Sequence, residues 1–332
     1  MEGSRANTIL RNAGVPSAFM GKTGSGIERV DITLADGRVA ALTPHAPGPG
    51  RDLDGGLVLP AFADIHTHLD KGHIWPRKPN PDGTWMSALL ATLEDRQELW
   101  SSPDVARRMD FALRCAYAHG TAAIRTHLDS APPQHEISWQ LFAEMRDKWR
   151  DRIELQAVAL FGPDILVDPL LLDQVARKAK EFGGILGGSV AVYERSKEAM
   201  LALCEKAGEL GLDIDLHTDE TGDPNAHALE HLAEAVIETD FTGNLVAGHC
   251  CVLTVQDEVT QRRTIEKVAR AGISIVSLPM CNIYLQDRAA DGHRTPIRRG
   301  ITLVHEFRAA GVKVAFASDN TRDPFYAYGD LD

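Results

Sequence analysis

The chain has 332 residues, with 35 Lys and Arg against 47 Asp and Glu, so its formal net charge is −12. This charge disfavours binding to nucleic acid or to an anionic membrane surface, because both are themselves negative. The sequence has no apolar run long enough for a membrane span or a signal peptide, and its five cysteines follow no zinc-finger or redox spacing, so we expect a cytoplasmic protein.

Residues 1–56 predict a small β subdomain. The segment GIERVDITLADGRVAALTP has the composition of short strands around a turn at Asp36-Gly37. We expect these residues to form part of a β-sandwich subdomain.

Eight apolar, strand-like runs follow from residue 57 onward. They cover residues 57–68, 121–129, 153–160, 184–193, 212–218, 244–250, 273–279 and 312–319. Segments with helical periodicity lie between them, and several end at the Gly expected just beyond a helix. Apolar strands that alternate with amphipathic helices predict a parallel sheet, and eight such units predict an α/β fold of the TIM-like (β/α)8 barrel type over residues 57–332.

Five polar residues stand at the C-terminal ends of these runs, namely His66, His68, His217, His249 and Asp319. The C-terminal ends of the strands in such a barrel meet at one rim, where the active site lies. Imidazoles and a carboxylate that converge from several strands suit a divalent cation with one position open for water. The sequence therefore predicts a metal-dependent hydrolase.

Each of these residues also has a structural interpretation. A His-x-His pair is common by chance, but His66 and His68 point to the same side of a strand, as joint ligation requires. Taken singly, His217 and His249 are more often structural histidines, and only their shared position at strand ends favours a functional role. Asp319 could instead cap a turn.

Two further residues lie near these strand ends. Glu220 is either part of a solvated acidic turn or a proton-transfer group. We favour proton transfer, because a desolvated carboxyl near a metal can have its pKa moved toward the working pH. His127 ends the second run, and we expect it to pack or hydrogen-bond within the barrel mouth rather than to bind metal.

The motifs IHTHLDK, LHTDE, AGHC and FASDNTRDPF, in this order and spacing, resemble those of the amidohydrolase superfamily, in particular its cytosine deaminase-like branch. The resemblance extends from about residue 50 to the end and includes NIYLQDR at residues 282–288. It implies one divalent metal ion, Zn²⁺ or Fe²⁺, held by His66, His68, His217 and Asp319. It also implies that Glu220 transfers protons, that His249 orients the hydrolytic water or the developing oxyanion, and that Phe325 stacks on a planar substrate.

The activity implied by this resemblance is hydrolytic deamination of an amino-substituted nitrogen heterocycle, with metal-activated water as nucleophile and ammonia as product. Members that act on cytosine carry a glutamine near the end of the third strand, where this chain has Leu160, Phe161 and Gly162. Compared with that glutamine, Gly162 lacks both hydrogen-bonding groups of the side-chain amide and leaves more space, which suits a pterin, an s-triazine or a modified pyrimidine. Asn320 stands where many relatives have a second Asp, so a cationic substrate group would gain less there.

Other functions remain open at this point. The same site could hydrolyse a cyclic amide or remove a substituted amine from an s-triazine. Relatives that cleave cyclic amides usually carry a carbamylated lysine at the end of strand four, where this chain has residues 191–194 without lysine, and this favours one metal and deamination. A ligand-binding homologue without activity is the non-enzyme alternative, and the sequence leaves homo-oligomerisation open.

The resemblance also implies a longer chain. Family members continue beyond the eighth strand with a closing helix and with strands that complete the β subdomain. This chain stops at Gly329-Asp330-Leu331-Asp332. We therefore expect a barrel truncated after strand eight.

Overall fold

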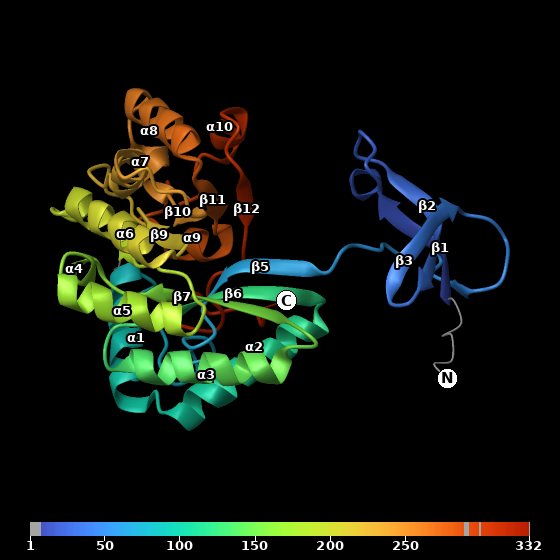
Figure 1. The fold of residues 1–332 in the computed structure, drawn as a ribbon, viewed down its shortest axis with the longest axis horizontal. Helices are drawn as coiled ribbons and strands as arrows, with labels where there is room; N and C mark the ends of the chain where they lie inside the picture. Colours follow the sequence, from blue (N-terminus) through green and yellow to red (C-terminus); the bar gives the residue numbers. More distant parts are fainter. Residues whose placement is uncertain (1–7, 289–291, 299, 332) are drawn as a thin grey trace. The chain divides into compact units, whose positions relative to one another are not determined.

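The computed structural model describes residues 8–288, 292–298 and 300–331. The chain divides into two units, of which the first ends at Ala61 and the second begins at Phe62 (Figure 1). Residues 1–7 of the expected β subdomain lie outside the described residues, as do residues 289–291, 299 and 332 of the expected barrel. The two units are described separately.

The first unit contains a four-stranded sheet with the order β3-β2-β1-β4. Strand β1 (Thr8–Pro16) pairs antiparallel with β2 (Ile27–Ala35), β2 pairs antiparallel with β3 (Arg38–Pro44), and the short β4 (Arg51–Asp52) pairs parallel with β1. The turn between β2 and β3 lies at Asp36-Gly37, where both residues have positive φ angles. Alternate residues of β1 and β2, such as Val15 and Val30, form a small apolar core.

The described residues of the second unit form eight parallel strands in two sheets. One sheet has the order β5-β6-β7, and the other has the order β12-β11-β10-β9-β8. Their bounds are β5 Phe62–Thr67, β6 Thr121–Asp129, β7 Glu154–Leu160, β8 Ser189–Val190, β9 Ile214–Thr218, β10 Leu245–His249, β11 Ser274–Ser277 and β12 Val314–Phe316. Each lies within a predicted run, so the strand prediction is confirmed.

Isolated backbone bridges join the two sheets at both edges. Val158 of β7 pairs with Ile185, just ahead of β8, and Thr67 of β5 pairs with Asp319, just beyond β12. The Asp319 amide also donates to the His66 carbonyl at 2.8 Å. The strands therefore form a closed ring, and the predicted TIM-like barrel is confirmed.

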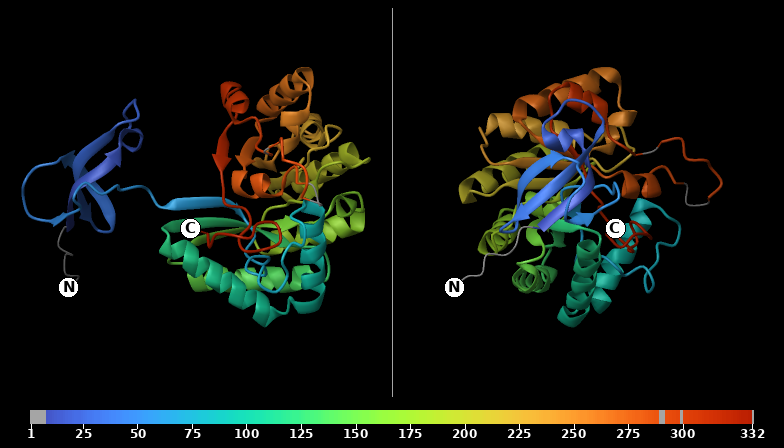
Figure 2. Two further views of the ribbon diagram at one scale, coloured as in Figure 1. Left: turned by 180° about the vertical axis from the view of Figure 1, so that it is seen from behind. Right: turned by 90° about the vertical axis from the view of Figure 1, so that its right-hand side faces the viewer.

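Helices lie on the outside of this ring (Figures 1 and 2). Helix α8 shows how the sequence sets their ends, because the Asp257 side chain accepts from the amides of Val259 and Thr260 at its start and Gly272 ends it in a left-handed conformation. Every helix in the described part of the chain is too short or too polar to span a lipid bilayer. The bounds are α1 Trp85–Leu99, α2 Ser102–Ala118, α3 Gln134–Trp149, α4 Pro163–Leu166, α5 Pro169–Glu181, α6 Ser196–Leu210, α7 Ala228–Glu238, α8 Glu258–Ala271, α9 Pro279–Leu285 and α10 Val304–Ala309.

Candidate metal centre

Four predicted ligands meet at the C-terminal rim of the strand ring. His66 lies in β5 and His68 directly follows it, His217 lies in β9, and Asp319 follows β12. The Nε2 atom of His217 lies 3.2 Å from the Nε2 atoms of both His66 and His68. The Asp319 Oδ1 atom lies 3.2 Å from His68 Nε2 and 3.7 Å from His66 Nε2.

These separations fit ligation of a single cation. Metal–nitrogen bonds of about 2.0–2.1 Å in a tetrahedral site hold neighbouring ligand atoms about 3.4 Å apart. Both Asp319 carboxylate oxygens are buried and accept no hydrogen bond from the described residues. Three ring nitrogens that face one another with their lone pairs repel unless a cation or a proton lies between them. The residues present therefore fit a divalent metal ion.

The protonation states agree with this use. Burial lowers the pKa of His66 and His217 well below the usual value and lowers that of His68 to about 4, so all three imidazoles are neutral near pH 7. Burial by itself would raise the pKa of Asp319, but its neighbours His68, His249 and His66 lower it below the usual range. Neutral imidazoles and an ionised carboxylate are the forms that bind metal.

His249 lies beside this cluster and connects it to Glu220. One ring nitrogen of His249 lies within 4.8 Å of ligand atoms of His66, His217 and Asp319. Its Nε2 atom is buried without a hydrogen bond, whereas its Nδ1 atom lies 3.4 Å from Glu220 Oε1. His249 has a φ angle of 65°, a left-handed conformation that ends β10 and turns the chain at the rim.

Glu220 is held through both carboxylate oxygens. Asn282 Nδ2 of α9 donates to Oε1 at 3.0 Å, and Trp85 Nε1 of α1 donates to Oε2 at 2.9 Å. Burial raises the pKa of Glu220, although the nearby His249 opposes the shift. Neither donor was predicted from the sequence. Asn282 begins the NIYLQDR motif, which could have drawn attention to it, whereas Trp85 has no signal in the sequence.

The three predicted substrate-binding residues differ in their surroundings. Phe325 is buried in a small apolar cluster with Cys281 and Leu285, and its ring meets that of Trp85 edge-on at 6.2 Å. The Asn320 amide is engaged by Asp323, to which it donates at 2.7 Å. Gly162 is exposed at the start of α4, and an added Cβ atom would meet nothing within 4 Å, but no hydrogen bond, ion pair or ring contact joins Gly162 to the cluster among the described residues.

His127 packs against His66, as expected, and its ligand atom also lies within 4.8 Å of ligand atoms of His66 and Asp215. Its ring centroid lies 3.9 Å from that of His66, and its Nε2 atom lies 3.7 Å from Asp215 Oδ1. Asp215 is itself paired with Arg125 at 2.8 Å. His127, held beside the Asp215–Arg125 pair, therefore supports the histidine rings of the metal cluster from inside the barrel.

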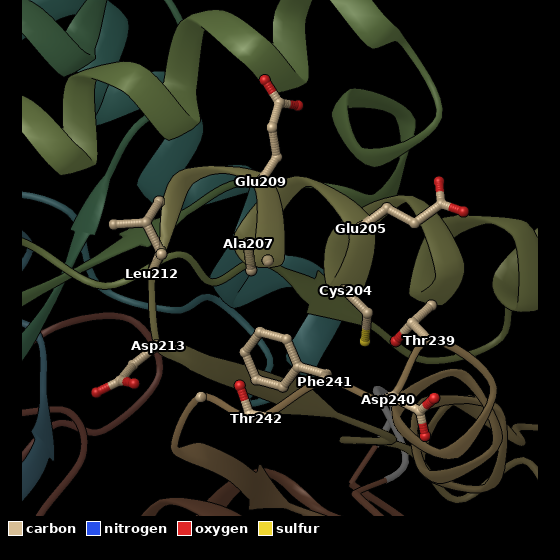
Figure 3. A pocket seen from close by; sticks show the side chains of 13 residues that line it. Cys204, Glu205, Ala207, Glu209, Leu212, Asp213, Thr239, Asp240, Phe241 and Thr242 are labelled. Carbon is tan, nitrogen blue, oxygen red and sulfur yellow. The ribbon is translucent and has the colours of Figure 1, made fainter.

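A separate hollow of about 460 Å³ lies far from this chemistry, at the opposite ends of the strands. It is bounded by the end of α6 and by the loop from Thr239 to Gly243 before β10 (Figure 3). Its one thiol, Cys204, is neutral, because burial raises its pKa to about 12. The histidine cluster, and not this hollow, is the candidate active site.

Comparison with known proteins agrees with this geometry. Residues 111–332 match the sequence model of the Amidohydrolase family. The chain is 51% identical over 335 aligned residues to a pterin deaminase from Rhizobium rhizogenes, covering 98% of this chain and 76% of the relative. It is 25% identical to an N-isopropylammelide isopropyl amidohydrolase from Pseudomonas sp., covering 91% of this chain and 73% of that protein.

A solved structure is also similar over nearly the whole chain. The crystal structure of 5-methylcytosine deaminase from Klebsiella pneumoniae with 5-fluorocytosine superposes with a TM-score of 0.83 at 25% identity. The alignment covers 98% of this chain and 78% of that one.

Proposed function

The chain belongs to the amidohydrolase family, and within this family we propose that it hydrolytically deaminates a pterin. The family predicted from the sequence motifs, with its cytosine deaminase-like branch, is thereby confirmed. The protein is a metal-dependent hydrolase of carbon–nitrogen bonds other than peptide bonds, and it deaminates an amino-substituted nitrogen heterocycle. The choice of a pterin rests on the 51% identity to a pterin deaminase.

The observation that carries this proposal is the meeting of His66, His68, His217 and Asp319 beside a half-buried Glu220. A divalent cation held by these four residues would supply Lewis-acid chemistry and lower the pKa of water at the site. Three imidazoles and one carboxylate suit zinc or iron(II).

The remaining chemistry belongs to side chains of this chain. Asp319 accepts a proton from the attacking water, and Glu220 delivers a proton to the ring nitrogen next to the amine-bearing carbon. The raised pKa of Glu220 favours the protonated form that this delivery needs. His249 directs its Nε2 atom to the oxygen on which charge develops. Asp319 passes the proton it took from water to the amino group, which leaves as ammonia, and Glu220 takes up the remaining hydroxyl proton as the carbonyl forms.

Ammonia release measured across a panel of heterocycles tests the proposal. The panel consists of pterin, cytosine, 5-methylcytosine, a 2-aminopurine and N-isopropylammelide, each supplied to protein loaded with zinc or with iron(II). We expect release from pterin with a kcat/KM at least about 100-fold above that for cytosine, because the hydrogen-bonding groups on the substrate ring must match those of the site. Isopropylamine release from N-isopropylammelide without ammonia release from pterin would contradict the proposal.

A further inference from the structure

Lys71 is a buried cation at the candidate active site with no assigned role. It lies three residues beyond His68 and is 6% exposed. Its Nζ atom lies 4.3 Å from the centroid of the Phe325 ring. Within residues 8–288, 292–298 and 300–331, this ammonium takes part in no hydrogen bond and no ion pair.

The charge of Lys71 acts on the groups that surround the site. Burial raises the pKa of three carboxyls, those of Glu220, Asp323 and Asp70, and the positive charge of Lys71 opposes each rise. Burial lowers the pKa of His66 and His68, and the same charge lowers it further. The ammonium is linked to the proton-transfer group by contacts, because the Phe325 ring beneath it meets the ring of Trp85, which donates to Glu220.

The hydrogen bonds of these carboxyls are made to other groups. Asp70 accepts from the Asp129 amide and from the Ser138 hydroxyl. Asp323 accepts from the Asn320 side chain at 2.7 Å and from the Phe325 amide at 2.8 Å. Glu220, as described above, accepts from Asn282 and Trp85.

The Nζ atom is not one of the fully enclosed side-chain atoms that lack a partner, so the ammonium reaches space that water can enter, and its one contact is with the face of the Phe325 ring. An acceptor on a substrate bound in that space would pair with the ammonium. Because the ammonium lies over the Phe325 ring, and Phe325 meets Trp85, which donates to Glu220, this acceptor belongs on the same ring that Glu220 protonates.

We propose that Lys71 binds the ring oxo group of the substrate, so that the enzyme selects 2-amino-4-oxo heterocycles and rejects their 2,4-diamino analogues. This inference rests on the proposed function and deepens it. An oxo group offers lone pairs to the ammonium, whereas an amino group at the same position turns N–H donors toward a cation and leaves it unpaired.

The test compares 2-amino-4-oxopteridine with 2,4-diaminopteridine in wild type and in Lys71→Met. Ammonia release gives kcat/KM for each substrate, and metal content is measured on the same samples. We expect wild type to favour the oxo substrate by about 100-fold or more. In Lys71→Met, this ratio falls to within about tenfold through loss on the oxo substrate, with metal content unchanged.

Three further variants separate charge from folding. Lys71→Arg keeps a cation and should retain most of the preference. Lys71→Gln keeps a neutral donor and should lie between Met and wild type, and it replaces Met if that variant fails to fold. Lys78→Met removes an ion pair with Glu94 at 2.6 Å on the surface and should leave the ratio unchanged.

The outcomes distinguish the two proposals. If wild type deaminates the oxo substrate and Lys71→Met keeps the wild-type ratio, the role of Lys71 is wrong while the proposed function stands. If wild type releases ammonia from neither pteridine, the proposed function is wrong and the inference falls with it.

Discussion

Glu220 shows how individual side chains prepare this site. Trp85 and Asn282 donate to separate oxygens of its carboxyl, and His249 approaches from the cluster side. These contacts fix the orientation of the carboxyl, and its burial raises its pKa. An oriented carboxyl with a raised pKa is suited to move a proton to and from a substrate.

Metal binding and proton transfer should separate by mutation. His217→Ala removes a central ring nitrogen of the cluster and should lower both bound metal and turnover. Glu220→Gln keeps the shape but cannot carry the proton, so metal content should persist while kcat falls about 100-fold or more. Elemental analysis and ammonia release on the same preparations check both. Normal rates in Glu220→Gln would remove it from the mechanism.

Asn282 should act as a positioning residue for Glu220. Its Nδ2 atom lies 3.0 Å from Glu220 Oε1 and 3.1 Å from His249 Nδ1, so Asn282→Leu releases both partners at once. We expect kcat to fall about 10–100-fold with little change in KM and with the metal retained, as for other supporting groups around metal sites. The exposed Asn225→Leu serves as control. A shift in KM alone would show that Asn282 contacts the substrate instead.

At the scale of elements, the barrel wall depends on close contact of the chain segments. Gly187, just before β8, lies between β7 and β9, where an added Cβ atom would be 2.4 Å from the Ala159 carbonyl oxygen and 2.6 Å from that of Asp215. A side chain cannot fit there without moving a strand. The chain around this glycine is correspondingly irregular, and β8 spans only Ser189–Val190.

Gly187→Ala should therefore destabilise the barrel. We expect a loss of about 2–3 kcal/mol in the free energy of unfolding, as for overpacked sites. Gly208→Ala provides the matched control, because Gly208 lies within α6 with nothing within 4 Å of an added Cβ atom. That change should stabilise by about 0.5–1 kcal/mol through helix propensity. Urea unfolding of the two variants measures both changes in the free energy of unfolding. Equal values for Gly187→Ala and Gly208→Ala would refute the close contact at Gly187.

Glu230 links helices α7 and α8 and should make the stability of this pair depend on pH. Its carboxyl contacts Arg263 Nε at 2.5 Å and Lys267 Nζ at 2.7 Å, and the Arg263 contact, with that of Lys267, lowers its pKa to about 2. A carboxyl whose pKa is lowered in the folded state stabilises that state. Its contribution is fully present above the unfolded pKa of about 4.3 and is lost as the pH falls toward 2.

Glu230→Gln should lower the free energy of unfolding at pH 7 by about 1 kcal/mol, since its partners are partly exposed and screened. The difference from wild type should shrink between about pH 4.5 and 2. Glu238→Gln, an exposed glutamate at the end of the same helix, should change little. Thermal unfolding at several pH values checks this, and a difference that grows on acidification would contradict it.

At the scale of the whole molecule, the site joins distant parts of the barrel. Its predicted ligands come from β5, from β9 and from the segment after β12, and the Thr67–Asp319 bridge closes the ring at the same rim. A cation bound there would hold first, middle and last strands together. Because the unfolded chain cannot present these ligands at one point, such binding favours the folded state.

Removal of metal should therefore lower thermal stability. With free metal at about 100 times its Kd, binding contributes about 2.7 kcal/mol, so chelation should lower Tm by several degrees. Calorimetry of metal-loaded and chelated protein measures the shift. In His217→Ala the same treatment should change Tm little. A wild-type Tm that is insensitive to chelation would argue against a metal held across these strands.

The sequence by itself determined the eight strands and the amidohydrolase motifs. An apolar run of a few residues followed by a turn is a local property, so the strand positions and the polar residues at their ends could be predicted without a fold. The spacing of these units predicted the closed ring, which the bridges Val158–Ile185 and Thr67–Asp319 complete.

Only the tertiary structure decided which side chains surround these strand ends. Trp85 and Asn282 contact Glu220 across 135 and 62 residues of sequence. Lys71 lies over the ring of Phe325, which is near the other end of the sequence. Helices and turns carry these residues, and periodicity reports only which face of an element is buried, not which partner it meets. Closure of the barrel brings these segments to one rim, because contacts between distant residues form only when the ring of strands is complete.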